Sequence, residues 1–369
     1  MRMKAAVYYG PGDIRIEEIN RPKAGPEGVV LKIKACGVCN ILDLDVWERR
    51  PALGIGVARG HEFSGEVVEV GSEVTMAKVG DRIFGEPIFR PCYRCESCRL
   101  KDYWRCVNWG EGEIGRAIHG AFAEYLWVPF VTNDSIIKLP KTLSYRDLAL
   151  IEPLSLSVGL ARKAKTDDLV VVLGQELVGL GTVAELKKMG VAKVIASDIS
   201  KKHLEASKEA GADIVVDTLN EDVVRVVMKE TSGIGADVVI QSDSRPIATL
   251  QAISMARRMG KVWLALAYSA PLMLNTSGTS IHSGVRWIGP GAGYSEPPFM
   301  FDPSMINLQT AWGTLGAKMP RWLGALELIQ SGRITADKHV THVFPLEKTK
   351  EAWDIAMNPH ETIKVMVEQ

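Results

Sequence analysis

Four cysteines, at Cys92, Cys95, Cys98 and Cys106, follow the spacing C-x2-C-x2-C-x7-C. This spacing lets several thiolates converge on one ion, and four thiolates complete a tetrahedral structural zinc site. A disulfide pair is one alternative, but the first residues of the chain carry charges and lack a secretory signal. An iron–sulfur cluster is another, although its fourth cysteine usually has a different spacing and precedes proline. The pattern favours structural zinc.

A second candidate metal site uses residues spread along the chain. Cys39 follows Cys36 in a C-x2-C pair, His61 and Glu62 lie in GHEFSGEVVEVG, and Glu152 lies in IEPLS. Catalytic zinc needs about three protein ligands and an open position, and it accepts N, S and O donors. Taken singly, the same residues also fit a redox cysteine pair, a structural histidine and a capping carboxylate. They form one site only if the fold brings them together.

A dinucleotide-binding turn is predicted where the apolar run Leu169–Gly174 leads into a helix. Gly174 and Gly179 hold the first and third positions of a G-x-G-x-x-G fingerprint, whereas Glu176 holds the second. A glycine at the second position normally lets the backbone approach a pyrophosphate. A carboxylate adds bulk and negative charge there, although it suits an empty helix N-terminus.

Asp198 ends the next predicted strand, close to the point about 20 residues after the turn where an acidic residue binds the ribose 2′-OH. The alternative is that Asp198 caps the helix predicted over KKHLEASK. Its position favours ribose binding. Because a carboxylate repels a 2′-phosphate, NAD is predicted rather than NADP.

The elements that must position these residues follow two patterns. Up to about residue 155, short β runs such as Val29–Ala35, Phe63–Gly71 and Asp81–Glu86 are bounded by Gly, Pro or Asp. They indicate mostly antiparallel strands, with a barrel as one arrangement. Beyond that point strands alternate with helices, which indicates βαβ units around a parallel sheet covered on both faces. A helix over Pro320–Ser331, then a strand and a final helix and strand, end the pattern.

Composition limits the classes of function. The chain has 369 residues with 44 Lys plus Arg and 44 Asp plus Glu, so no net charge points to nucleic acid or an anionic membrane. A membrane span needs roughly 18 or more consecutive apolar residues, and the sequence has no such run. We therefore expect a cytoplasmic protein of about two or three domains that acts on a small molecule.

The order GVC, GHEFSGEVVEVG, VGDRI, the cysteine cluster, HGAFAEY, EPLS and the glycine turn resembles the zinc-dependent medium-chain dehydrogenase family, which includes alcohol, sorbitol and threonine dehydrogenases. The resemblance covers nearly the whole chain. It implies an α/β protein in which a GroES-like, β-rich catalytic domain (residues 1–155 and 306–369) is interrupted by a Rossmann NAD-binding domain (residues 156–305). It also implies a homodimer or homotetramer.

The resemblance assigns roles to the candidate metal ligands. Cys39, His61 and Glu152 become the catalytic zinc ligands, since the acidic residue of EPLS stands where alcohol dehydrogenases have a second cysteine. Glu62 becomes a neighbouring carboxylate that can exchange onto the metal. Cys36 is expected to be a buried free thiol.

The resemblance also implies a set of cofactor contacts. Val178 is expected behind the nicotinamide, Ala265–Ala267 beside it, His203 near the adenosine ribose and Lys364 near the pyrophosphate. The full set expected to bind NAD is Gly174, Gln175, Val178, Gly179, Asp198, His203, Ala265, Ala267 and Lys364.

The chain departs from the family after Cys39. The family usually has a Ser or Thr and a His that relay the alcohol proton to solvent. With one inserted residue, Asp45 aligns with that His, while Ile41 lacks the hydroxyl. Asp45, Asn40 with water, or a substrate hydroxyl must then carry the proton, unless Asp43 and Asp45 only cap the following turn.

The leading hypothesis is a zinc- and NAD-dependent dehydrogenase that acts on a secondary alcohol or polyol-like substrate, or on its ketone. Glu176 and the missing relay hydroxyl leave a zinc-dependent lyase or isomerase with tightly bound, recycled or impaired NAD as the alternative. A vestigial, redox-silent relative is a third possibility, against which the joint presence of Cys39, His61 and Glu152 argues. Arg59 could attract a carboxylate or phosphate on the substrate, or it could pair with a surface acid.

Overall fold

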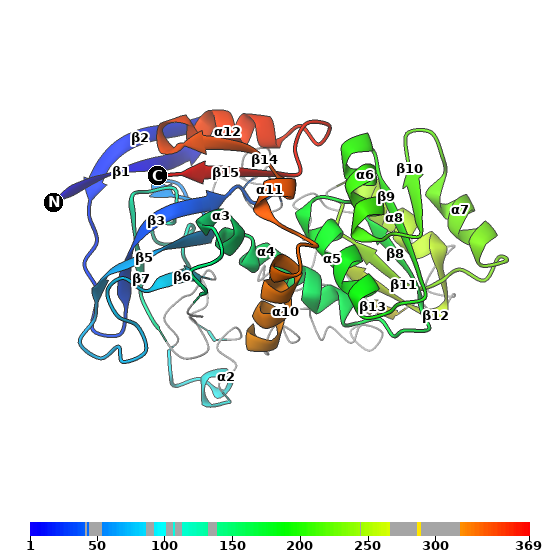
Figure 1. Ribbon diagram of the computed structural model, residues 1–369, viewed down its shortest axis with the longest axis horizontal. Helices are drawn as coiled ribbons and strands as arrows, with labels where there is room; N and C mark the ends of the chain where they lie inside the picture. The colour runs from blue at the N-terminus through cyan, green and yellow to red at the C-terminus, as the bar shows by residue number, and fades with distance from the viewer. Residues whose placement is uncertain are drawn as a thin grey trace. The chain divides into compact units, whose positions relative to one another are not determined.

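The chain forms two compact units. The structure, a computed structural model, describes residues 1–40, 43, 54–85, 92–100, 106–107, 113–131, 139–243, 245–265, 286–288 and 318–369, without the side chains of residues 246, 286–288 and 318–320. The first unit comprises Met1–Pro153 and Thr335–Gln369, and the second comprises Leu154–Ile334 (Figure 1). Among the described residues, no helix has the length and apolar character needed to cross a bilayer.

The first unit is built on two sheets. The smaller has the order β2-β1-β4, and the larger has the order β14-β15-β3-β5-β6, with β7 also paired to β3. Every pairing is antiparallel except that of β14 with β15. The strands are β1 (Arg2–Gly10), β2 (Asp13–Asn20), β3 (Val29–Gly37), β4 (Val57–Ala58), β5 (Glu62–Val70), β6 (Arg82–Gly85), β7 (Tyr125–Val128), β14 (Val340–Pro345) and β15 (Lys364–Glu368).

Short helices complete this unit: α2 (Glu96–Arg99), α3 (Tyr145–Ala149), α11 (Ala336–His339), the 3-10 helix η3 (Leu346–Lys348) and α12 (Thr349–Ala356). Its core is aromatic at the centre. The Trp353 ring of α12 stacks on Tyr8 with centroids 6.1 Å apart and meets the edge of Phe122 at 6.0 Å. All three side chains are fully buried, so α12 is fixed against the strands by the hydrophobic effect.

The second unit contains the predicted parallel sheet. Its order is β10-β9-β8-β11-β12-β13 and every pairing is parallel. The strands are β8 (Leu169–Leu173), β9 (Lys193–Asp198), β10 (Ile214–Asp217), β11 (Ala236–Gln241), β12 (Ala256–Leu264) and β13 (Arg286–Ile288). Within this sheet the chain first forms β8, then adds β9 and β10 on one side, and then crosses back to form β11 on the other side of β8. This reversal is the point where doubly wound sheets bind dinucleotides at the carboxyl ends of their strands.

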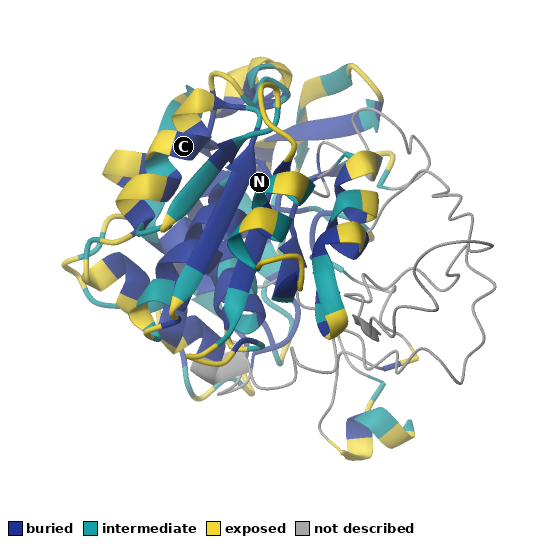
Figure 2. Ribbon diagram, turned by 90° about the vertical axis from the view of Figure 1, so that its right-hand side faces the viewer, coloured by how far each residue is buried: buried dark blue, intermediate teal, exposed yellow. Residues whose placement is uncertain are grey.

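Helices α5 (Leu177–Lys188), α6 (Lys201–Ala210), α7 (Val223–Glu230) and α8 (Pro246–Met255) connect these strands. The strands are largely buried, whereas several helices carry exposed residues (Figure 2). Strands buried on both faces explain the continuous apolar runs in the sequence, such as Leu169–Leu173.

The first boundary between the units lies between Pro153 and Leu154, two residues before the predicted position, and helix α4 (Ile151–Ala161) spans it. The predicted second boundary, between residues 305 and 306, lies outside the described residues. The segment from α10 (Lys318–Gln330) to Ile334 belongs to the second unit, although the sequence placed it with the first. Within this unit, Glu327 of α10 pairs with Lys188 of α5 at 2.7 Å.

Candidate metal centres and cofactor site

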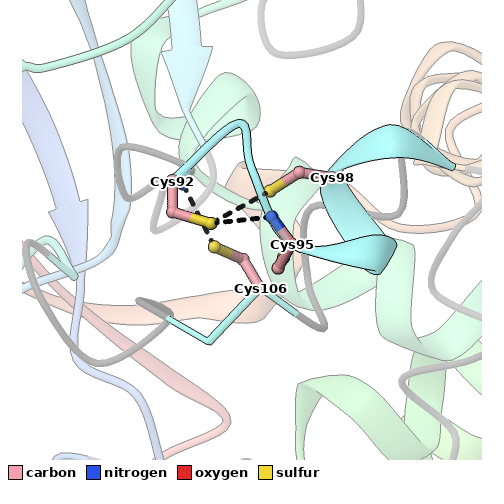
Figure 3. A group of neighbouring side chains, drawn as sticks. All are labelled: Cys92, Cys95, Cys98 and Cys106. Carbon is pink, nitrogen blue, oxygen red and sulfur yellow. Dashed lines mark hydrogen bonds between the residues drawn. The ribbon is translucent and has the colours of Figure 1, made fainter.

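The four cysteines of the predicted structural zinc site come together. Their sulfur atoms all lie within 4.8 Å of one another, and Figure 3 shows the side chains gathered around α2. The sulfurs of Cys92 and Cys98 are 3.9 Å apart, far beyond the roughly 2.05 Å of a disulfide. Zinc–sulfur bonds of about 2.3 Å place tetrahedral sulfurs about 3.8 Å apart. The geometry therefore fits four thiolates around zinc, and none of the four cysteines forms a disulfide.

The thiols of this cluster differ in acidity. Backbone N–H groups of Arg94 and Cys95 lower the pKa of Cys92 to about 6 despite opposing desolvation. Burial, followed by the neighbouring cysteines, raises the pKa of Cys98 to about 12. Gathering four such groups disfavours their joint ionisation, because like charges repel at short range. A divalent cation removes that conflict, so the donor set itself points to a metal.

The second candidate site brings together Cys39, His61 and Glu62. One ligand atom of each lies within 4.8 Å of the others, and all three residues are buried. Pairing between β3 and β5 explains their approach, since Gly37 faces Glu62 across the ladder. Cys39 follows the end of β3 and His61 precedes β5. A sulfur, an imidazole nitrogen and a carboxylate oxygen form a donor set that suits zinc.

Glu152 is not a member of this buried group among the described residues. It is the second residue of α4 and is partly exposed. Its charge nevertheless reaches the site, because Glu152 is one of the groups that raise the pKa of Lys364. The structure thus gathers the predicted exchange carboxylate, Glu62, with the other two donors. Glu152 as a ligand stays a prediction.

Lys364 of β15 lies beside this site. Its ammonium forms an ion pair with Glu62 and donates to the carbonyl oxygen of Val38 at 2.7 Å. Burial opposes its charge, but Glu62 and Cys39 outweigh that effect, so its pKa is raised. Contact with a pyrophosphate stays a prediction. The described contacts instead use the Lys364 side chain, which is 2% exposed, to neutralise a buried carboxylate.

Asp43 and Arg59 form a buried ion pair that the sequence did not predict as a unit. The guanidinium Nε of Arg59 donates to Oδ1 of Asp43 at 3.3 Å, and Oδ2 of Asp43 accepts the Cys39 N–H at 3.1 Å. Arg59 therefore pairs with a buried acid and not with a surface acid, which was one of the two alternatives expected from the sequence. The proposed proton-handling residue Asp45 and the neighbouring Ile41 lie outside the described residues.

At two glycines of the predicted dinucleotide turn, a Cβ would lie too close to neighbouring backbone atoms. Gly174 has φ +83°, and a Cβ there would lie 2.7 Å from the backbone nitrogen of Asp243. A Cβ at Gly179 would collide with the carbonyl oxygen of Gly174. Glu176 has an extended backbone at the N-cap of α5, without a side-chain cap. Extended backbone suits any residue, so Glu176 is compatible with the turn itself.

Asp198 lies at the carboxyl end of β9 and binds the turn. Its Oδ2 accepts the N–H of Gln175 at 2.6 Å, and its Oδ1 accepts the N–H of Ser200 at 2.8 Å. Burial opposes its charge, but His203, whose Nδ1 lies 3.2 Å from Oδ1, and the two N–H donors lower the pKa. Ser200, rather than Asp198, caps α6 by accepting the His203 N–H. The capping alternative is therefore wrong.

Three of the four remaining predicted cofactor contacts lie among the described residues of the second unit. Gln175 is buried and donates through Nε2 to Val172 O at 2.7 Å. Val178 is 9% exposed in the first turn of α5. Ala265 is 7% exposed, and its N–H donates to Gln241 O at the end of β11. Ala267 lies outside the described residues. Contact of these groups with NAD stays a prediction.

Comparison with known proteins identifies the family. Residues 25–141 match the model described as "Alcohol dehydrogenase GroES-like domain", and residues 178–277 match "Zinc-binding dehydrogenase". D-arabitol-phosphate dehydrogenase from Enterococcus avium is 30% identical over 377 residues, which cover 99% of this chain and 97% of that protein. The chain belongs to the zinc-dependent medium-chain dehydrogenase family.

Solved structures agree with this dehydrogenase assignment. 2R,3R-butanediol dehydrogenase from Bacillus subtilis has a TM-score of 0.78 and 28% identity, covering 100% of this chain and 99% of the other. A zinc-binding dehydrogenase from Sinorhizobium meliloti 1021, solved bound to NADP, has a TM-score of 0.79 and 26% identity, with complete coverage of both chains. The GroES-like and Rossmann architecture and the oxidoreductase class are confirmed, and these relatives give no support to the lyase alternative.

Proposed function

We propose that this dehydrogenase uses zinc and NAD to interconvert a secondary alcohol or polyol-like substrate and its ketone. The observation that carries the proposal is the buried group of Cys39, His61 and Glu62. It supplies sulfur, nitrogen and oxygen donors in a family of zinc-dependent enzymes. A zinc ion held there supplies Lewis-acid polarisation of a substrate oxygen and lowers the pKa of an alcohol. A second zinc on the four-cysteine cluster has a structural role.

Two carboxylates compete for the third ligand position. Glu62 is buried within the group and already carries the neutralising ammonium of Lys364. Glu152 is partly exposed and contributes charge from nearby. We propose Cys39, His61 and Glu152 as ligands during catalysis. Glu62 then stays paired with Lys364 and binds the metal only when it exchanges with another ligand. The ion pair lowers the availability of the Glu62 carboxylate and so favours this division of roles.

The cofactor proposal rests on the turn after β8. Gly174 and Gly179 permit its tight backbone, and Asp198 is anchored to it through Gln175. Nicotinamide dinucleotide supplies the hydride acceptor, and a carboxylate at Asp198 favours a free 2′-hydroxyl over a 2′-phosphate. We therefore propose NAD as the cofactor, although one relative was solved with NADP.

The proposal also assigns groups to the proton path. Ile41 replaces the family hydroxyl, and Asp45 is proposed as the group that accepts the alcohol proton. Asn40, next to the ligand Cys39, has a buried side-chain oxygen without a hydrogen-bond partner, so it can accept a bond from water or a substrate hydroxyl. A polyol supplies such an extra hydroxyl. We further propose a cytoplasmic enzyme that forms a homodimer or homotetramer.

Calorimetric titration of NAD+ and NADP+ into zinc-loaded enzyme tests the proposal, together with a screen of sorbitol, butanediol and polyol phosphates for hydride transfer. We expect NAD+ to bind in the micromolar range and more tightly than NADP+. Glu176→Gly and Glu176→Gln separate the effects of bulk and charge at the second fingerprint position. If wild type binds neither nucleotide and both variants also fail, the cofactor proposal is refuted.

A further inference from the structure

The Asp43–Arg59 ion pair joins the two segments that carry metal donors. Arg59 precedes His61 by two residues, and Asp43 follows Cys39 by four. Both side chains are removed from solvent, with exposures of 6% for Arg59 and 0% for Asp43. The guanidinium also lies over the Tyr8 ring, 5.8 Å from its centroid. The pair is therefore enclosed in the core of the first unit.

Asp43 fixes the backbone of Cys39 where the sheet no longer does so. Strand β3 ends at Gly37, and the next N–H, of Val38, donates to Val365 O at 2.9 Å. The Cys39 N–H donates instead to Oδ2 of Asp43, while the Asp43 N–H returns to Cys39 O at 3.2 Å. These reciprocal bonds tie Asp43 to Cys39, so the direction of the Cys39 side chain depends on where the Asp43 carboxylate is held.

Arg59 holds that carboxylate from a rigid segment. The carbonyl oxygen of Arg59 accepts the Phe122 N–H at 2.9 Å, and that of Gly60 accepts the Ala121 N–H at 2.9 Å. Gly60 has φ +96°, and a Cβ there would lie 2.7 Å from Cys36 Sγ. The backbone from Arg59 to His61 is thus constrained on both sides. The Arg59 guanidinium therefore holds the Asp43 carboxylate in place, and that carboxylate in turn fixes the Cys39 N–H.

A buried ion pair is a poor source of net stability, because desolvation offsets its attraction and apolar residues of similar volume often serve as well. Its distinctive property is geometric: a guanidinium fixes the orientation of a carboxylate. Partners of this kind around a metal ligand typically change metal affinity by about 10–100-fold when they are removed. Orientation of a donor is therefore the effect that best fits this pair.

We propose that Arg59 is a positioning residue that, through Asp43, sets the Cys39 thiolate at the distance from His61 that a zinc ion requires. The inference rests on the proposed zinc function. It predicts that the pair controls metal affinity and ligand geometry at this site and leaves the four-cysteine site unaffected.

Zinc affinity in competition with a chromophoric chelator tests the proposal. Wild type is expected to release two zinc ions in separate phases, and His61→Ala identifies the phase that belongs to this site. Arg59→Met should weaken that phase by about 10–100-fold without changing the other. Arg59→Lys retains the charge but not the planar fork, so it should restore only part of the affinity.

Cobalt absorption at the same site, taken as the difference from His61→Ala, should shift in Arg59→Met because the thiolate changes its position. If that variant fails to fold, Arg59→Met combined with Asp43→Asn removes both charges and keeps the measurement accessible. Arg146→Met is the control in the same unit. The Arg146–Glu368 pair, with Nε 2.6 Å from Oε1, is partly exposed, and no described contact joins it to Cys39, His61 or Glu62.

Wild-type affinity and spectrum in both the single and the double variant would refute the positioning role while leaving the zinc function intact. If wild type itself binds only the four-cysteine zinc, the proposed function fails, and the positioning role fails with it. An equal loss in Arg146→Met would also overturn the inference, because the effect would then be one of general stability.

Discussion

Replacement of Gly174 by Ala is expected to damage the second unit more than the same change at Gly190. The two glycines have almost the same φ, +83° and +80°. A Cβ at Gly190 meets nothing within 4 Å, whereas at Gly174 it lies 2.7 Å from Asp243 N and 2.8 Å from Ser242 C. Those neighbours are backbone atoms at the end of β11, so they cannot swing away as a flexible side chain would.

The difference can be worked out from these contacts. At Gly190 a left-handed Ala costs about 1–2 kcal/mol, and the stiffer unfolded chain returns about 0.4–1 kcal/mol. The net loss is roughly 1 kcal/mol. Gly174→Ala carries the same strain plus about 1–3 kcal/mol for overpacking, which gives roughly 2–4 kcal/mol in total.

Chemical denaturation followed by circular dichroism measures both losses, and NAD+ titration of the folded variants supplies a second readout. We expect Gly190→Ala to bind the cofactor like wild type and Gly174→Ala to bind it more weakly, because the turn must shift. Equal losses of unfolding free energy in the two variants would refute the reasoning. The close approach of the turn to the backbone after β11 would then make no difference to the free energy of unfolding.

Two further predictions concern the cysteines and Asp198. Cys98→Ser should lower the zinc content by one ion per chain, measured by elemental analysis, whereas the control Cys36→Ala should retain both ions; full zinc retention in Cys98→Ser would contradict a four-thiolate site. Asp198→Asn should reduce the free energy of unfolding at pH 7 by about 1.5–3 kcal/mol, because the carboxylate accepts two backbone hydrogen bonds and lies 3.2 Å from Nδ1 of His203. The folded pKa of Asp198 lies below its ordinary 3.8, so this contribution is complete above that pH and is lost as the pH falls through the folded pKa. Denaturation at several pH values should therefore show the difference between wild type and variant shrinking below about pH 4, and a constant difference would exclude the linkage.

Local patterns predicted the local features of the fold. The runs at Val29–Ala35 and Phe63–Gly71 form β3 and β5, and Leu169–Gly174 forms β8 with its glycine turn. The four cysteines were recognisable because their spacing within a short segment limits how far apart they can lie. Such features depend on residues that are close together in the sequence, so the sequence alone is enough to locate them.

Features that depend on distant pairing could be predicted only through the family resemblance, not from local patterns. The register that sets Gly37 opposite Glu62 decides which carboxylate joins Cys39, and no spacing in the sequence reports that register. The Asp43–Arg59 contact was missed for the same reason. Only the burial of both residues distinguishes this pair from an exposed ion pair, and burial follows from the assembled core.

Strand β15 has a consequence for how the protein is made. It lies between β14 and β3, and Val365 accepts the N–H of Val38 from the opposite end of the chain. Unit two is one continuous segment, so it can fold on the ribosome as soon as Ile334 has emerged. The sheet that carries Cys39 must wait for the final strand, since its central pairing joins residues far apart in sequence. The region around Cys39 therefore cannot reach its final arrangement before β15 has been synthesised.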